Sequence, residues 1–302
     1  MTSRFAWLSA LLILVAGPAV AAPPLQVVAS FSILADMARE VGGDQVQVTA
    51  LVGPDGDAHV YEPTPADAKL VSRADLLIVN GLGYEGWFDR LFASAAAKAP
   101  VVVASTGIRP RTMEEEGEGR VTDPHAWQDL ANGRRYVANI AAALARVAPD
   151  RVAVFDANAR AYDQRLAALD AWVRAELGGI PPERRRVITS HDAFGYFGQA
   201  YGVGLLAAVG VSTEAEPTAR GVAALVRQMK DEAVRVVFVE NMSDPRLVRQ
   251  IARDAGGQVG GELYADALSP PDGPAPTYEA MFRYNTATLK AGLEANAKPA
   301  SR

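Results

Sequence analysis

The sequence contains no cysteine among its 302 residues. Disulfide frameworks and thiolate metal sites are therefore excluded, and no cysteine is available to carry a lipid at the mature N-terminus. From this absence we expect a protein that is not a lipoprotein.

Histidine and basic stretches are also scarce. The chain has 3 histidines, and its 30 lysines and arginines are outnumbered by 35 acidic residues, which gives a net charge of −5. This balance, with no basic stripe, argues against nucleic acid or an anionic membrane surface as a partner. A cationic ligand is compatible with it. The apolar content of 49% is ample for a buried core.

Past the N-terminus the chain has no apolar run long enough for a membrane span, so we expect no membrane insertion. Residues 1–22 contain an early cation, Arg4, an apolar run at 5–16, a Gly-Pro breaker and then small residues. This order is typical of a secretory signal peptide, with cleavage after Ala21 or Ala22. The prediction is export to a Gram-negative periplasm; an N-terminal membrane anchor is the alternative.

Apolar runs rich in β-branched residues alternate along the chain with amphipathic segments, a pattern typical of parallel α/β units. The expected strands are residues 25–29, 46–52, 75–80, 101–105, 186–190, 205–209, 235–240 and 258–263. The expected helices are residues 32–41, 64–73, 85–98, 131–147, 151–177, 194–200, 218–232, 245–255 and 278–295. We predict an α/β fold of two lobes, each with a mostly parallel four-stranded sheet flanked by helices.

The division into lobes follows from length and from one long helical segment. Beyond the signal peptide, about 280 residues exceed the usual size of a single core. The long helix is followed by a Gly-Gly-Ile-Pro-Pro sequence, which suggests a rigid connector that ends at a boundary. The predicted units are a signal peptide at 1–22, an N-terminal lobe at 23–148, a connecting helix at 149–180 and a C-terminal lobe at 181–302. One large α/β domain is the alternative.

Residues 107–122 break this alternation. They are polar and acidic, contain four glutamates and no histidine, and show no periodicity. We predict a solvated loop there.

The three histidines all fall near predicted strand ends or helix starts. His59 follows the second strand, His125 precedes the helix that begins near residue 131, and His191 ends the first strand of the second lobe. Ligands gather at the carboxyl ends of parallel strands, so these imidazoles can converge on one cleft. Considered alone, each of them is more simply explained as an exposed or structural histidine than as a metal ligand. Together with one oxygen donor, three neutral imidazoles form a closed four-coordinate shell that suits zinc.

The fourth donor must be a carboxylate, and Asp266 is the best candidate because it follows the last predicted strand of the second lobe. The alternative for Asp266 is a turn aspartate. Asp123, Asp192 and Glu240 lie near ligand segments or strand ends. We expect them, if they have a role at the site, to fix imidazole tautomers through the distal ring nitrogen.

Several segments carry a family resemblance that spans nearly the whole mature chain. They are SFSILADM at 30–37, VGPDGDAHVYEPTP at 52–65, DPHAW at 123–127, SHDAFGYF at 190–197 and FVEN at 238–241. These segments resemble the zinc/manganese solute-binding proteins of ABC transporters, the ZnuA, TroA and PsaA group. The His-x-Tyr-x-Pro-Thr-Pro pattern that starts at His59 is the most specific of them.

The resemblance implies metal ligation by His59, His125, His191 and Asp266, between two lobes that one long helix bridges and whose closure is limited. It also implies partners, namely an ABC permease with its cytoplasmic ATPase, and a monomeric receptor. Members that resemble manganese receptors commonly carry glutamate at the position of His191, and a nitrogen-rich shell favours zinc. The expected transported ligand is therefore Zn²⁺. The histidine-rich loop of many zinc receptors is absent, so Mn²⁺ or Fe²⁺ stays the alternative cargo.

Two other classes of function compete. A zinc-dependent hydrolase would use three histidines with an open coordination position, but the chain lacks a His-Glu-x-x-His motif and any other compact metallohydrolase spacing. Ser190-His191-Asp192 is contiguous, which is not how a catalytic triad meets in space. An adhesin that holds metal only incidentally is the other alternative. We predict a receptor that is not an enzyme.

Overall fold

The computed structural model describes residues 22–115, 119–213 and 218–296. The predicted signal peptide lies outside these ranges except for Ala22. Within them, no helix is both long enough and apolar enough to cross a membrane.

The first sheet is parallel and has the strand order β2-β1-β3-β4. Its strands are β1 (Leu25–Phe31), β2 (Val46–Val52), β3 (Leu76–Val79) and β4 (Val101–Val103), and the helices between them are α1 (Ser32–Gly42), α2 (Pro65–Arg73) and α3 (Phe88–Ser94). A capping box between Thr64 and Asp67 starts α2. Gly43 ends α1 with a φ of 54°, a backbone conformation that favours glycine.

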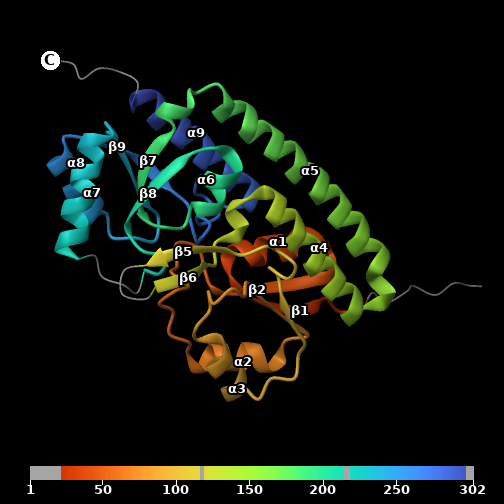
Figure 1. The fold of residues 1–302 in the computed structure, drawn as a ribbon. Helices are drawn as coiled ribbons and strands as arrows, with labels where there is room; N and C mark the ends of the chain where they lie inside the picture. The colour runs from red at the N-terminus through yellow and green to blue at the C-terminus, as the bar shows by residue number, and fades with distance from the viewer. Residues whose placement is uncertain (1–21, 116–118, 214–217, 297–302) are drawn as a thin grey trace, which may run out of the picture.

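The second sheet is also parallel, with the order β10-β9-β7-β8. Its elements are β7 (Arg186–His191), α6 (Gly195–Tyr201), β8 (Gly204–Val209), α7 (Ala219–Asp231), β9 (Val236–Glu240), α8 (Pro245–Ala255), β10 (Gln258–Leu263) and α9 (Tyr278–Asn296). The two sheets have the same strand order. In each, the second strand along the chain lies at one edge of the sheet, next to the first strand. The predicted fold class is confirmed (Figure 1).

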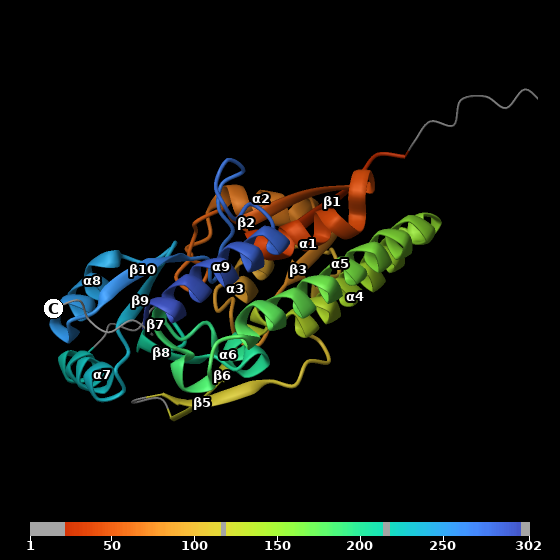
Figure 2. The ribbon, with the colours of Figure 1, turned by 90° about the horizontal axis from the view of Figure 1, so that it is seen from above.

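A helical hairpin connects the two sheets. It consists of α4 (Leu130–Val147), a 3₁₀ turn at Pro149–Arg151, and α5 (Val152–Gly178). One face of α5 is buried at every third, fourth or seventh residue: Phe155, Tyr162, Leu166, Leu169, Val173 and Leu177. Asn158 donates to the carbonyl of Val41 at 3.1 Å near α1, and Arg165 pairs with Glu279 of α9 at 3.0 Å. The helix therefore contacts α1, which flanks the first sheet, and α9, which flanks the second, along one side of the molecule (Figure 2).

The prediction of a solvated loop at 107–122 is wrong. Residues 111–115 and 119–123 form an antiparallel pair of strands, β5 (Arg111–Glu115) and β6 (Gly119–Asp123). A hairpin with most of its described side chains partly or fully exposed shows no alternation of apolar and polar residues, so its sequence resembles that of a loop. Its backbone pairing places Arg111 opposite Asp123.

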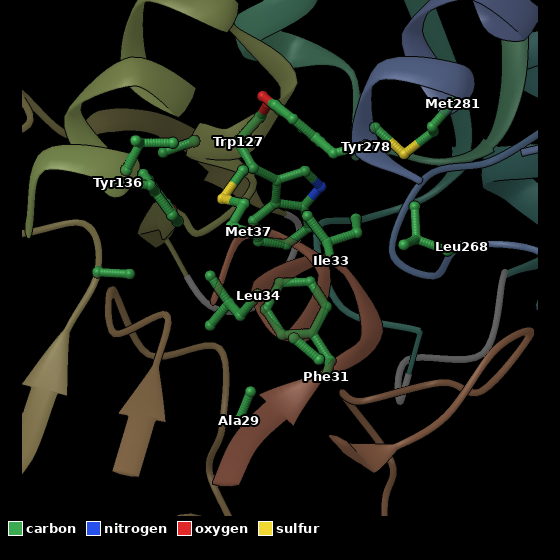
Figure 3. Packing of buried hydrophobic residues seen from close by; sticks show 14 of the residues in the cluster. Ala29, Phe31, Ile33, Leu34, Met37, Trp127, Tyr136, Leu268, Tyr278 and Met281 are labelled. Atoms are coloured by element: carbon green, nitrogen blue, oxygen red, sulfur yellow. The ribbon is translucent and has the colours of Figure 1, made fainter. Parts of the chain in front are cut away.

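The largest apolar cluster joins the two sheets. Phe31 of β1, Ile33 and Met37 of α1, and Trp127 before α4 pack with Tyr278 of α9 (Figure 3). Trp127 is fully buried and donates from Nε1 to the carbonyl of Ala265 at 3.0 Å. A separate cluster lies between β7, β9 and the helices α7 and α8. The shared core fixes the segment of Trp127, beside His125, against the loop that carries Asp266.

Candidate metal site

Four side chains from widely separated parts of the chain meet between the two sheets. One donor atom each from His59, His125, His191 and Asp266 lies within 4.8 Å of the others. His59 is on the loop after β2, His125 follows β6, His191 is the last residue of β7, and Asp266 follows β10. The structure therefore brings together all four residues that the sequence singled out.

The spacing of the donor atoms matches a small coordination shell. Asp266 Oδ2 lies 3.1 Å from His191 Nε2 and 3.3 Å from His59 Nε2, and Asp266 Oδ1 lies 3.6 Å from His125 Nε2. The Nε2 atoms of His59 and His125 face each other at 3.2 Å. Ligands around a tetrahedral zinc with bonds of about 2.0–2.1 Å are about 3.3 Å apart. The donors are thus spaced to surround one ion.

His125 is held by the carboxylate two residues before it. Asp123 Oδ1 accepts from the backbone N–H of His125 and faces its Nδ1, both at 2.9 Å. Because a carboxylate oxygen accepts, Nδ1 carries a hydrogen, and Nε2 is directed to the shared centre, where it can bind an ion once its own proton is lost. The side chains of Asp123 and His125 are both fully buried.

His191 is held in the same way by a residue on the neighbouring strand. Glu240, the last residue of β9, accepts from the backbone N–H of His191 at 3.0 Å through Oε1, and its Oε2 bonds to Nδ1. The side chain of Glu240 is fully buried. Adjacent parallel strands end at the same edge of the sheet, so a ligand and its anchor meet there.

His59 has no carboxylate on its distal ring nitrogen among the described contacts. Its backbone N–H donates to Asp57 Oδ1 at 2.9 Å, and Asp57 Oδ2 accepts from Thr213 Oγ1 at 2.7 Å. The imidazole packs edge-on against Tyr84, with ring centroids 4.7 Å apart. The loop and an aromatic ring thus position His59, and its side chain is 5% exposed.

Asp266 is fixed through the backbone beside it. Trp127 Nε1 and Gln128 Nε2 both donate to the carbonyl of Ala265, at 3.0 and 2.7 Å. The N–H of Leu268 donates to Ser32 Oγ at 2.9 Å. The Asp266 side chain is fully buried, and its Oδ1 has no hydrogen-bond partner. A buried carboxylate oxygen without a partner is costly, and a cation at the centre of the four donors would satisfy it.

The pKa shifts of Asp266 and His59 favour binding of a cation. Burial alone would raise the pKa of Asp266, but the neighbouring His125 and His191 hold it well below its usual range. Burial lowers the pKa of His59, against the opposing hydrogen bond to Asp266. Asp266 is therefore ionised and His59 neutral at neutral pH.

His125 and His191, the two histidines held by carboxylates, differ from His59 in the direction of their pKa shifts. Burial opposes their charged forms, but Asp266 and Asp123 raise the pKa of His125 to about 9. Glu240 and Asp266 raise the pKa of His191 well above its usual value. A metal ion that binds to these imidazoles at neutral pH must therefore displace protons.

Two cavities reach the site. One of about 490 Å³ includes His191, Asp57 and Thr213 in its lining. The other, of about 540 Å³, includes His59 and Tyr84. His59 and His191 are thus the two donors that line these cavities, whereas His125 and Asp266 are fully buried.

The sequence also pointed to three carboxylates as anchors. Asp123 and Glu240 lie against imidazoles as expected, whereas the carboxylate of Asp192 makes no hydrogen bond to an imidazole within the described contacts. No role at the site was predicted for Asp57 or Arg111. Asp57 lies in the same motif as His59 and could have been found there, but Arg111 lies in the segment predicted as a loop.

Comparison with known proteins gives consistent matches. The family model described as "Zinc-uptake complex component A periplasmic" matches residues 27–292. The iron-binding protein YfeA of Yersinia pestis is 32% identical, over 91% of this chain and 88% of the relative. The manganese-binding lipoprotein MntA of Bacillus subtilis is 33% identical, over 89% and 90%. The solved structure of the periplasmic zinc binding protein TroA from Treponema pallidum matches with a TM-score of 0.83 and 30% identity, over 89% and 99%.

These relatives correct one prediction. Absence of cysteine led us to expect a protein that is not a lipoprotein, but MntA and several other relatives are named lipoproteins, which contradicts that expectation. The prediction rested on a single residue type, and it concerned an N-terminal segment that lies almost entirely outside the described residues.

Proposed function

The chain belongs to the zinc-uptake complex component A family of periplasmic proteins, and from this premise we propose which ion it captures and which residues hold it. It is a metal-binding substrate-binding protein of the ABC-transporter class. In our proposal the transported ion is bound by His59, His125, His191 and Asp266. The observation that carries the proposal is the convergence of these four donors within 4.8 Å.

Zinc is the proposed cargo on the chemistry of the donors. Three imidazole nitrogens and one carboxylate form a nitrogen-rich shell, which suits zinc better than manganese. The donor separations of 3.1–3.6 Å at Asp266 support a compact four-coordinate ion. Relatives are named for manganese and iron as well as zinc, which supports Mn²⁺ or Fe²⁺ as the alternative cargo.

The proposed division of the chain places the ion between two lobes, 23–148 and 181–302, joined by a connector at 149–180. Delivery would be to a membrane permease with a cytoplasmic ATPase, by a monomeric receptor. Relatives named as substrate-binding components of metal ABC transporters support these partners. A receptor role rather than catalysis is supported by the fourth protein donor, because hydrolytic zinc sites keep one position open for water.

The test is the metal content of the protein isolated from its native compartment without chelators, followed by competition between Zn²⁺ and Mn²⁺ for the purified metal-free protein. We expect one zinc ion per chain and displacement of manganese by zinc. Manganese in the isolated protein would favour the alternative cargo, because affinity order alone lets zinc occupy a manganese site in vitro. Absence of any tight metal site would contradict the proposal.

A further inference from the structure

The β5–β6 hairpin brings an arginine against the other lobe. The backbone N–H of Arg111 donates to Tyr196 Oη of α6 at 2.9 Å, and its guanidinium lies 5.5 Å from the centre of the Tyr196 ring. A Cβ on Gly195 would lie 1.5 Å from Arg111 Nη1, so the guanidinium uses space that only glycine leaves. The side chain is 27% exposed. Arg111 is therefore held in a defined place between the hairpin and α6.

From that place Arg111 reaches the anchor of a proposed ligand. Its Nη1 forms an ion pair with Asp123 Oδ2, while Asp123 Oδ1 accepts from the backbone and ring of His125. The Tyr196 hydroxyl also donates to the backbone carbonyl of Asp123 at 3.3 Å. Each oxygen of the buried carboxylate is thus committed to one neighbour, Oδ2 to Arg111 and Oδ1 to His125.

The other anchor has no such support. Both oxygens of Glu240 bond to His191, and no lysine or arginine pairs with Glu240 among the described ion pairs. Glu240 is placed by its strand, whereas Asp123 lies at the end of a two-stranded hairpin outside the main sheets. On this hairpin, the ion pair with Arg111 is the described contact that holds Oδ2 of Asp123.

We propose that Arg111 is a positioning residue for metal capture: it orients Asp123, and through it the imidazole of His125, and ties this orientation to α6 of the second lobe. The inference rests on the proposed function. Arg111 does not touch the ion. It acts on the orientation of the ligand His125. Loss of Arg111 should therefore both weaken metal binding and change the coordination geometry.

The test measures zinc affinity by chelator competition for Arg111→Gln. Loss of an outer partner of a metal ligand typically costs about 10–100-fold in affinity, and we expect about tenfold here. Arg111→Lys, which keeps the cation, should recover most of the loss. Arg120→Gln is the matched control, because Arg120 lies on the other strand of the same hairpin and the hydrogen bond described for its side chain goes to Thr112 Oγ1, at 2.8 Å, and not to Asp123. It should bind zinc as the parent does.

Two further measurements separate positioning from a general structural role. In an Asp123→Asn background, Arg111→Gln should cause no additional loss, because residues that act through one another are not additive. The absorption spectrum of bound Co²⁺, which reports coordination geometry, should change in Arg111→Gln and be unchanged in Arg120→Gln. Gly195→Ala provides a second route, because it fills the space of the guanidinium without removing the charge, and it should lower affinity in the same direction.

Parental zinc affinity in both Arg111→Gln and Gly195→Ala would overturn the inference, and so would an equal loss in Arg120→Gln or an undiminished loss in the Asp123→Asn background. If the parent chain itself fails to bind metal, the proposed function fails first. If the parent binds and the Arg111 variants match it, only the positioning role is lost.

Discussion

The two lobes have the same strand order but present their side chains to the site differently. In the second lobe, the adjacent strands β7 and β9 end in His191 and Glu240, a proposed ligand and its anchor. In the first lobe, the equivalent strands are β1 and β3. Ser30 lies near the end of β1 and Asn80 directly follows β3, and both donate to Glu85 instead. The first lobe supplies His59 and His125 from segments beyond its sheet. The comparison teaches that one half of the site is framed by a sheet and the other by loops that need added support.

The largest effect should come from removing a proposed ligand. We expect Asp266→Ala and His191→Ala to weaken zinc binding by more than about 100-fold, the upper end of the cost of losing an outer partner. His59→Ala should cost less, because no carboxylate fixes the distal nitrogen of its ring among the described contacts. Chelator competition measures all three. A loss at His59 equal to that at His191 would break the proposed difference between the lobes.

Removal of either anchor should have the next largest effect. Asp123→Asn and Glu240→Gln each remove the charge that fixes an imidazole, and each should weaken zinc binding by about 10–100-fold. Isothermal titration on both variants, with Asp192→Asn as the matched control, would sharpen the comparison. Asp192 makes no described hydrogen bond to an imidazole, so its variant should bind zinc within a few-fold of the parent. An unchanged affinity in Glu240→Gln would contradict the role of the strand end.

The dependence of affinity on pH should distinguish the anchored histidines from His59. In the metal-free protein His125 has a pKa of about 9 and the pKa of His191 is raised well above its usual value, so zinc must displace protons from both at neutral pH. Affinity should therefore fall with decreasing pH, about tenfold per unit for each displaced proton. His125→Ala should reduce the slope, whereas His59→Ala should preserve it, because the pKa of His59 is lowered. A flat affinity between pH 6 and 9, two values chosen to bracket the histidine range, would contradict imidazole ligation.

The smallest of the predicted effects is on thermal stability. An ion that binds only the folded state stabilises it by about 2.7 kcal/mol at a free concentration of 100 times Kd. For a chain of this size that shifts the melting temperature by several degrees, and a chelator should reverse the shift. Differential scanning calorimetry on the parent and on Asp266→Ala would show whether the gain belongs to the proposed site. A melting temperature that chelation leaves unchanged in the parent would count against metal capture.

Much of the fold was predictable because buried parallel strands and amphipathic helices leave strong periodic patterns. All eight strands of the two main sheets were expected, with ends that differ by a few residues. The helix predicted at 85–98 forms only over Phe88–Ser94. The hairpin β5–β6 was missed because its exposed side chains carry no such pattern.

The candidate site was predictable to a similar degree. His59, His191 and Asp266 follow strands of the parallel sheets, which gather their strand ends at one edge, so the sequence could place them in one cleft. His125 follows β6 of the antiparallel hairpin instead, and only its place before a predicted helix pointed to the site. The anchoring contacts of Asp123 and Glu240 depend on side-chain geometry, and the sequence could not separate these two residues from Asp192, which makes no described hydrogen bond to an imidazole. Arg111 could not be found, because its role depends on a strand pairing that the sequence does not signal.

The most direct measurement is anomalous diffraction from crystals of the protein grown with zinc, recorded on both sides of the zinc absorption edge. The account predicts one strong peak per chain, within bonding distance of the Nε2 atoms of His59, His125 and His191 and of a carboxylate oxygen of Asp266. A principal peak elsewhere, or one that leaves the imidazole from either lobe unbound, would contradict the claim that the two lobes share one ion.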